Sequence, residues 1–286
     1  MHLVTRHGTL HLSGPPVVMG VLNVTPDSFS DAGRFCTVEA ATAHAAQMIA
    51  AGAAIIDVGP ESSRPGAQPV EPAEQLRRAV PVIEAVRRRH PDTIISIDTQ
   101  SAAVAEAALQ AGADIINDIT ALRSDPEMAA LAADAGAPVL LMHMQGTPAT
   151  MQDRPTYGDV VQEVKQFLSE RIAFAVAAGI PLSRLITDPG IGFGKTAAHN
   201  GELLRRLHEF VALGPPVLVG ASRKSVVRSL VGTDPATVLA GSLMCALAAA
   251  AAGVKIVRVH DVGPTVELLR AAAAAIPQSS WCRQPL

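Results

Sequence analysis

The sequence has few aromatic residues, few cysteines and little net charge, and each of these deficits excludes a class of function. One Trp, one Tyr and six Phe offer few rings for stacking on bases, and a net charge of −3 gives no basic surface for a phosphate backbone. Nucleic acid is therefore not expected as a partner. The three cysteines lie far apart without a C-x-x-C pair, which predicts reduced thiols in a cytoplasmic protein.

Long apolar runs are also missing. Residues 1–14 lack the apolar core of a signal peptide, and the most apolar stretch, 238–253, is shorter than the ~20 residues that a membrane-spanning helix needs. We therefore expect no membrane association, and we expect 238–253 to form a packed, Ala-rich helix.

The sequence does contain an alternation of short apolar runs and longer segments with helical spacing. The apolar runs are 17–23, 54–59, 93–99, 113–119, 137–144, 184–190, 216–222 and 255–261. The predicted helices are 38–51, 72–89, 102–111, 126–135, 157–178, 199–213, 235–252 and 263–276. Eight such units favour a TIM (β/α)8 barrel, preceded by a short hairpin within residues 1–14, as a single domain over residues 1–286. A doubly wound open sheet remains the alternative, because a sequence does not show whether a sheet closes.

The stretch DPGIGFGKT, residues 188–196, ends like a phosphate-binding P-loop but does not fit that motif. The motif needs a glycine five positions before Gly194, where the sequence has Pro189, which lacks a backbone N–H. The dinucleotide-binding pattern G-x-G-x-x-G fails as well, because Lys195 occupies the place of its third glycine. Neither nucleotide motif is therefore predicted here.

Polar side chains follow most of the apolar runs at their carboxyl ends. In a parallel barrel these ends share one face, where active sites are built. A single Asp or Asn after a strand is usually a helix cap or turn former, but caps alone do not predict acids, amides and cations together. The residues are Asn23, Asp57, Asp98, Asn117, Asp118, His143, Asp188, Ser222, Arg223, Lys224, Arg258 and His260.

The chemistry of these residues suggests two separate binding regions. Asp98, Asn117 and Asp188 suit a flat heterocycle rich in N–H groups, because carboxylates accept paired donors. A cationic group suits an anion such as phosphate. Its members are Lys224, Arg258 and His260. The loop 23–34 adds Asn23 and Asp31, oxygen ligands of the kind that Mg²⁺ takes beside substrate phosphates.

Taken together, the motifs at the strand ends resemble those of the dihydropteroate synthases. The motifs are NVTPDSFSDAGR (23–34), ESSRPGA (61–67), ISIDT (95–99), NDI (117–119), LMHMQGTPATMQ (141–152), DPGIGFGKT (188–196), GASRKS (220–225) and VRVHDV (257–262). They occur in order along nearly the whole chain. The resemblance implies a homodimeric TIM barrel that uses Mg²⁺ and joins 4-aminobenzoate to (7,8-dihydropterin-6-yl)methyl diphosphate in folate synthesis. Diphosphate and 7,8-dihydropteroate would be the products.

Carried over by motif position, the resemblance implies three groups of site residues. The pterin would meet Asp98, Asn117, Met142, Asp188, Phe193, Gly220 and Lys224. The diphosphate would meet Asn23, Ser63, Arg258 and His260, with Mg²⁺ on Asn23. The aminobenzoate would lie among Phe29, Ser63, Arg64, Pro65, Lys224 and Ser225. In this interpretation Lys195 is a surface lysine and His143 has a structural or indirect role.

The resemblance also implies a mechanism. Diphosphate leaves a CH₂ group attached to an electron-rich pterin, so that an SN1-like path through a delocalised cation is expected. Mg²⁺ and the cationic side chains would stabilise the leaving group, while the acids would offset the cationic ring. The expected catalytic residues are Asp31, Asp98, Asp188 and Lys224.

One motif departs from the family pattern. Where the family usually has GGESTRPG, this sequence has GPESSRPG, with Pro60 in place of Gly and Ser63 in place of Thr. Proline fixes φ and removes an N–H, so the start of the aminobenzoate loop should be stiffer. This arrangement resembles acquired, sulfonamide-insensitive members of the family, although DPGIGFGKT keeps the ordinary form.

Two other functions remain open at this level. One is a pterin- or folate-binding barrel without synthase activity, against which the motifs SRPG and SRKS argue. The other is a Schiff-base aldolase with Lys224 as nucleophile, which would need a desolvated lysine of low pKa.

Overall fold

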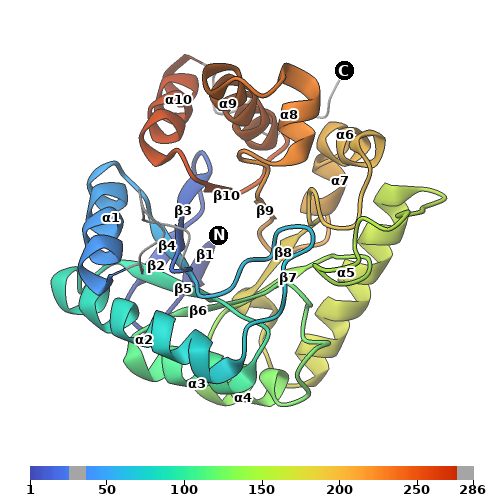
Figure 1. The fold of residues 1–286 in the computed structure, drawn as a ribbon. Helices are drawn as coiled ribbons and strands as arrows, with labels where there is room; N and C mark the ends of the chain where they lie inside the picture. Colours follow the sequence, from blue (N-terminus) through green and yellow to red (C-terminus); the bar gives the residue numbers. More distant parts are fainter. Residues whose placement is uncertain (26–36, 276–286) are drawn as a thin grey trace.

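The chain folds into a barrel of eight parallel strands surrounded by helices (Figure 1). The computed structural model describes residues 1–25 and 37–275. Neighbouring strands follow the order β8-β7-β6-β5-β4-β3-β10-β9, and a bridge between Thr187 and Val217 brings the two ends of the sheet together. The strands are β3 (Val17–Asn23), β4 (Ile55–Gly59), β5 (Ile94–Asp98), β6 (Ile115–Asp118), β7 (Val139–Met142), β8 (Leu185–Asp188), β9 (Leu218–Val219) and β10 (Ile256–Val259). The TIM barrel predicted from the sequence is confirmed, and the doubly wound alternative is wrong.

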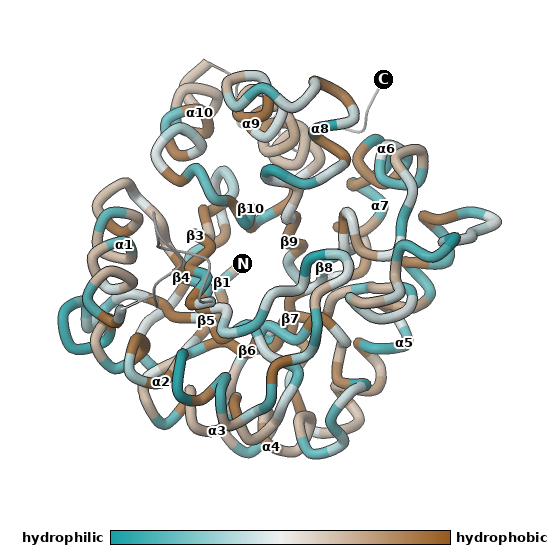
Figure 2. The backbone as a smooth tube through the Cα atoms, viewed as in Figure 1, coloured by the Kyte–Doolittle hydropathy of each residue, from teal (hydrophilic) through white to brown (hydrophobic). Residues whose placement is uncertain are grey.

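The strands alternate between two apolar cores, as the pleat requires. Residues on one side fill the barrel interior, and residues on the other side pack against the helices. Figure 2 shows the apolar backbone segments gathered along the strands. The interior set includes Met19, Ile55, Ile94, Ile115, Leu140, Ile186, Leu218 and Ile256. Polar residues an even number of positions further along these strands therefore belong to the same inward row.

The helices begin and end mostly where the sequence predicts, and local capping explains the differences. Helix α5 starts at Val160 rather than at 157, because the Asp159 carboxylate accepts from the backbone N–H groups of Val161 and Gln162. The segment predicted as one helix at 199–213 is two helices, and the short α8 was not predicted. The helices are α1 (Val38–Ala50), α2 (Pro72–Arg89), α3 (Ala102–Ala111), α4 (Met128–Ala135), α5 (Val160–Ala177), α6 (Ala197–Arg205), α7 (His208–Val211), α8 (Ser225–Val231), α9 (Pro235–Ala251) and α10 (Val262–Ala275).

The expected N-terminal hairpin is present, formed by β1 (His2–Val4) and β2 (Thr9–His11). Its leucines join the core inside the barrel, so the hairpin covers the end at which the strands begin. A buried carboxylate anchors it: Asp114 accepts from the backbone and the ring of His7, and its other oxygen lies 2.7 Å from Nη2 of Arg87. The hairpin leaves the opposite end of the barrel open for a site.

The Ala-rich segment predicted as a packed helix is α9, which buries Val238, Cys245 and Ala249 against the barrel. Across the described part of the chain, no single helix is both long and apolar enough to cross a bilayer. The bent pair α8 and α9 meets that test only jointly, on length and composition, with 112° between the two helices.

Candidate active site

The pleat brings the polar strand-end residues together at the barrel mouth. Asp98 on β5 pairs in register with Asn117 on β6, and Met142 on β7 pairs with Asp188 on β8. All four lie in the inward row, two or four positions beyond an interior apolar residue. Residues separated by 90 positions of sequence thus meet in one place, because the sheet closes.

A buried ion-pair network forms the floor of the mouth. Arg258 donates from Nε to an oxygen of Asp57 at 2.7 Å, and its Nη2 lies 2.9 Å from Oδ2 of Asp98. Asn117 donates from Nδ2 to the same Asp57 carboxylate at 3.2 Å. Asp57 is fully buried, so its charge is stable there only because a guanidinium and an amide surround it.

This network corrects the expected separation of acids from cations. Arg258 and Asp98 are in contact rather than on opposite sides of the mouth, because a buried guanidinium must be neutralised. Sequence analysis placed Asp57 among the polar residues at the strand ends but assigned it to neither binding region. A sequence signal for its role was available, because Asp57 is the one charged residue in the apolar strand IIDVG, and a charge inside such a strand needs a partner.

The network shifts the pKa of its members. Burial raises the pKa of Asp98 to about 7, against the opposing effect of Arg258, and the neighbouring Asp57 adds to the increase. For Arg258 burial acts to lower the pKa, but the charges of Asp57 and Asp98 outweigh it and raise the pKa. Asp98 is therefore a group whose charge responds to pH near neutrality.

The opposite wall consists of Asp188, Lys224 and the loop between β8 and α6. Lys224 donates from Nζ to the carbonyl of Ile191 at 2.6 Å, and its ammonium lies 4.3 Å above the ring of Phe193. Asp188 accepts from the N–H of Gly190 at 2.7 Å, and burial raises its pKa. Burial lowers the pKa of Lys224 to about 8, with Asp188 opposing.

Lys195 is not a surface lysine, contrary to the sequence prediction. Its residue is 3% exposed, and Nζ lies 2.9 Å from Nδ1 of His143 and from the carbonyl oxygens of Gly190 and Phe193. The prediction failed because Lys195 lies only a few residues before a surface helix, and the turn that buries its side chain is a tertiary feature. His143 is buried and serves as its acceptor.

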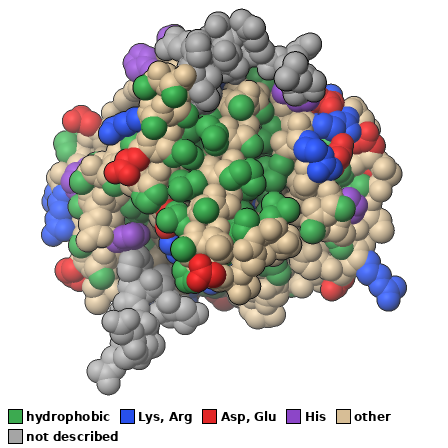
Figure 3. Space-filling view, turned by 90° about the horizontal axis from the view of Figure 1, so that it is seen from above, with side chains coloured by type: hydrophobic (Ala, Val, Ile, Leu, Met, Phe, Trp, Pro, Cys, Tyr) green, Lys and Arg blue, Asp and Glu red, His purple; other side chains and the backbone are tan. Residues whose placement is uncertain are grey.

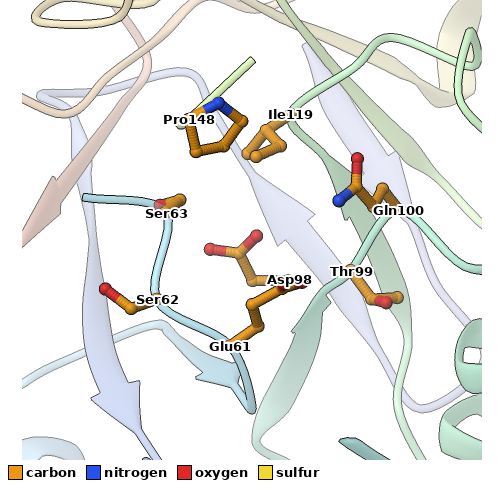
Figure 4. A pocket seen from close by; sticks show the side chains of 8 residues that line it. All are labelled: Glu61, Ser62, Ser63, Asp98, Thr99, Gln100, Ile119 and Pro148. Atoms are coloured by element: carbon orange, nitrogen blue, oxygen red, sulfur yellow. The ribbon is translucent and has the colours of Figure 1, made fainter. Parts of the chain in front are cut away.

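A small cavity lies beside the ion-pair network (Figure 4). The carboxyl group of Asp98 faces it from β5, with Ser62 and Ser63 on the loop after β4 and Pro148 on the loop after β7. A wider groove of ≈ 420 Å³ adjoins it along the same two loops, lined by Glu61, Ser62, Gln100, Thr120, Arg123, Met144 and Thr147 among others. That volume falls in the range of small-molecule sites, about 300–1,000 Å³.

The loop after β4 is held over this cavity by one hydrogen bond that joins its two ends and one that ties its middle to the loop after β7. Glu61 accepts from the N–H of Val70 at 2.8 Å, and Gly66 donates its N–H to the carbonyl of Pro148 at 3.0 Å. Ser63 is half-buried at the cavity, while the side chains of Arg64 and Pro65 are exposed.

The remaining expected residues lie around the same mouth. His260 follows β10 and contacts Ser222, with its backbone N–H 3.2 Å from Oγ. Burial, together with the charge of Arg258, lowers the pKa of His260 to about 4. Gly220 lies against the aliphatic part of the Arg258 side chain, since a Cβ there would lie 3.6 Å from Cβ of Arg258. Ser225 is exposed at the start of α8.

The oxygen donors suit a magnesium ion that takes its other ligands from a substrate. Asn23 ends β3, and Gly59 beside it leaves its oxygen uncovered, since a Cβ there would lie 3.4 Å from Oδ1. Among the described residues no group of three or more His, Cys, Asp or Glu forms a metal site. One amide oxygen with phosphate and water is a set that Mg²⁺ accepts. The expected residues Phe29 and Asp31 lie outside the described residues.

Comparison with known proteins adds three relatives. A family model described as pterin binding enzyme matches residues 19–260. Dihydropteroate synthase of Escherichia coli K12 is 49% identical over 276 residues, or 96% of this chain and 97% of that protein. A Yersinia pestis dihydropteroate synthase crystallised with a sulfonamide drug complex is 48% identical, with a TM-score of 0.91 over 96% of this chain and 99% of that chain. A Xanthomonas albilineans dihydropteroate synthase with 4-aminobenzoic acid is 46% identical, with a TM-score of 0.89 over 96% and 99%.

The barrel, its charged mouth and the match over most of the length define the class of protein: the chain belongs to the family of pterin-binding enzymes. Within that family its function is that of the dihydropteroate synthases, which are transferases of folate biosynthesis. The sequence resemblance to this family is confirmed, and the binding-module and aldolase alternatives are set aside.

Proposed function

We propose that the mouth holds both substrates of the synthase reaction, with the pterin deepest. The pterin ring would lie between the ion-pair network and Lys224. The carboxylates of Asp98 and Asp188 would accept hydrogen bonds from the edge of the ring, and the amide of Asn117 would donate and accept them. Met142, Phe193 and Gly220 would supply the apolar faces and the space against which a flat ring packs. The single observation that supports this most is the network at the mouth, in which Arg258 joins Asp98 to buried Asp57 and Asn117 donates to the same Asp57.

Arg258, His260 and Ser63 would bind the diphosphate at the outer side of the pterin. A guanidinium suits phosphate because it donates two parallel N–H bonds. Nη2 of Arg258 lies 2.6 Å from Asp57 and 2.9 Å from Asp98. When phosphate oxygens approach, Arg258 can keep Asp57 through Nε while Nη2 exchanges Asp98 for the ligand. Asp98 would then be free to accept a hydrogen bond from the pterin. Binding of the diphosphate part of the substrate would in this way promote binding of its pterin part.

The 4-aminobenzoate would enter last, between the loop after β4 and the start of α8. Arg64, Pro65, Lys224 and Ser225 would line its path, and the X. albilineans enzyme is described with this compound. Phe29 and Asp31, outside the described residues, would complete the site in this proposal, Asp31 as a catalytic group.

The proposed chemistry is a substitution at the CH₂ group of the pterin. The C–O bond breaks with its electron pair leaving on diphosphate, and the cation spreads into the ring, where Asp188 and ionised Asp98 stabilise it. Arg258 and Lys224 stabilise the departing charge. The aromatic amine then forms the C–N bond and loses one proton to water. No strong base is needed, because the electrophile is a cation.

Magnesium fits this scheme at Asn23, with phosphate oxygens and water as its other ligands. When bound, it would neutralise the leaving diphosphate. The residues that would hold it here are Asn23 and, outside the described residues, Asp31.

A reshaped aminobenzoate loop would select against sulfonamides, which resemble aminobenzoate but extend further. Pro60 is buried and its carbonyl accepts from Arg78 at 2.9 Å, which ties the start of the loop to α2. With φ fixed by the proline and a methyl group missing at Ser63, the loop differs in stiffness and shape where a longer ligand would press on it.

A second copy of the chain would cover the face of α8 and α9. Figure 3 looks onto this side of the molecule, where apolar side chains gather over the surface. Leu230 is 60% exposed and Met244 is 49% exposed, and both lie on these two helices. Exposed large apolar residues clustered on one face are typical of an oligomer interface.

The synthase assay tests the proposal directly. Purified protein is incubated with the pterin diphosphate, 4-aminobenzoate and Mg²⁺, and dihydropteroate is quantified with and without EDTA and with and without sulfamethoxazole. Product that requires all three components is expected. Binding of the pterin without product formation would support a binding module instead.

A further inference from the structure

One buried cation has no part in the proposed chemistry. Lys195 directs its ammonium at Nδ1 of His143 and the carbonyl oxygens of Gly190 and Phe193, each at 2.9 Å, and the carbonyl oxygen of His143 lies further away at 3.4 Å. A protonated lysine has three N–H donors and no acceptor, so the three nearer partners are enough to take all of its hydrogens. A neutral amine would leave one of these buried acceptors facing a lone pair.

The two carbonyl groups belong to the turn that holds Lys224. They flank Ile191, whose own carbonyl accepts from Nζ of Lys224 at 2.6 Å. The ring of Phe193, in the same turn, lies 4.3 Å beneath the ammonium of Lys224. One short segment therefore carries Lys195 on one side and Lys224 on the other.

The turn is pressed directly against the segment after β7. A Cβ on Gly190 would collide with the carbonyl oxygen of His143, and one on Gly194 would lie 2.9 Å from Cβ of Gln145. Both glycines also have positive φ, 69° and 61°. With so little clearance, Lys195 and His143 join two loops that cannot shift independently.

We propose that Lys195 is a positioning residue for the synthase reaction: through the carbonyl groups of Gly190 and Phe193 it sets where Lys224 and the Phe193 ring lie. This inference depends on the proposed function of Lys224. Methionine in place of Lys195 would fill much of the same volume but remove the donor to Nδ1 of His143 and to the carbonyl of Phe193, while the carbonyl of Gly190 would keep only the N–H of Phe193. We expect the turn of residues 190–193 to shift so that these carbonyl groups reach other donors. The carbonyl of Ile191, which accepts from Lys224, would shift with it.

The charged and titratable groups around Lys195 are His143 from β7, Asp188 from β8 and Lys224 from the start of α8. Burial lowers the pKa of Lys195 to about 7, and Asp188 opposes this. Burial also lowers the pKa of His143 to about 2, so its ring is neutral and Nδ1 is available as an acceptor. Opposite a protonated Lys195, which has no lone pair to accept with, Nδ1 of the neutral ring is the acceptor.

A double-mutant cycle distinguishes positioning from a merely structural role. Lys195→Met should lower kcat/KM for the pterin diphosphate by about 10²-fold, the cost of a misplaced catalytic group. In a Lys224→Met background the same change should cost only about twofold, because the group it positions is gone. The matched control is Lys165→Met, which removes an ion pair between Lys165 on α5 and Glu209 on α7 and should leave kcat/KM unchanged. An equal loss in both backgrounds, or normal turnover by folded Lys195→Met, would overturn the proposal.

A second pair of variants covers the case in which Lys195→Met does not fold. His143→Asn keeps an acceptor on Cγ where Nδ1 was, whereas His143→Leu removes it. The Asn variant should retain most of the activity and the Leu variant should lose it. Equal activities would contradict the inference.

A readout that does not need turnover separates this inference from the proposed function. Acetylation of Lys224 by acetic anhydride, followed by mass spectrometry, should be several-fold faster in Lys195→Met or His143→Leu than in the wild type. If the wild type makes no dihydropteroate, the proposed function fails, and the acetylation rate still decides whether Lys195 restrains Lys224. An unchanged rate would refute the positioning role.

Discussion

At the scale of single residues, a few buried charges decide both the stability and the chemistry of the mouth. Asp57 is the centre of this arrangement, because Arg258 and Asn117 both donate to it. Asp118, next to Asn117, shows the contrast. It accepts from the backbone of Thr120 and Leu122 and forms a turn, as an ordinary Asp after a strand does. The alternation of the strand places one side chain in the site and its neighbour outside it.

Replacing Asp57 with Asn should weaken both folding and catalysis. The variant keeps the volume but removes the charge that holds Nε of Arg258, so a drop in unfolding free energy of about 1–3 kcal/mol is expected for a lost charged hydrogen bond. Activity should fall by about 10²–10³, because the diphosphate-binding guanidinium is misplaced. Urea denaturation and steady-state kinetics measure the two effects. Glu202→Gln, which breaks an exposed ion pair with Arg205, is the control and should do neither.

Asp98 should make stability depend on pH in an unusual direction. Its pKa in the folded protein is raised to about 7, so the unfolded chain loses the proton near its ordinary value of 3.8 while the folded chain keeps it. Between those values, rising pH therefore favours the unfolded chain at this residue. The stability of Asp98→Asn relative to the wild type should increase between pH 4 and pH 8, by up to about 4 kcal/mol. If the unfolding free energies of the two proteins, measured in urea, differ by the same amount at every pH, the pKa of Asp98 is not raised in the folded protein.

At the scale of elements, the strands orient the side chains of the mouth, and the loops after the strands determine which ligands fit. The loop after β4 is tied to α2 through Pro60 and Arg78 and to the loop after β7 through Gly66 and Pro148. Its shape is therefore set by two neighbouring elements.

Restoring the usual family residues in this loop should restore sensitivity to sulfonamides. The double variant Pro60→Gly with Ser63→Thr adds a methyl group and relaxes the backbone. One methyl contact is worth about tenfold or more in discrimination. The ratio of the sulfamethoxazole inhibition constant to the KM for aminobenzoate should therefore fall by about tenfold. If the wild type is already as sensitive as the double variant, loop shape does not exclude the drug.

At the scale of the whole molecule, barrel closure and the face of α8 and α9 matter most. Closure turns eight strand ends into one mouth, and the hairpin fills the other end. Leu230 is exposed on α8, the helix that begins directly after Lys224, so an interface there would support the element that carries Lys224.

A charge on this face should separate the proposed dimer. Leu230→Asp with Met244→Asp is expected to shift the protein from dimer to monomer in sedimentation velocity at micromolar concentration. Val176→Asp, at a similarly exposed apolar position on α5, is the control and should leave the assembly unchanged. A wild-type protein that is already monomeric would contradict the proposed interface.

The sequence by itself determined the eight strand–helix units and the polar residues that end the strands. Periodicity located the eight strands, and the polar residues that end them are those that the inward row brings together. Strand and helix patterns are local and have fixed periods, so they can be read without coordinates.

Only the tertiary structure decided which charges touch. Arg258 and Asp57 are 201 positions apart, and Lys195 looks like a surface residue until the turn before it packs on His143. Such contacts depend on how the sheet closes and how closely glycine lets two backbones approach, which no local pattern contains.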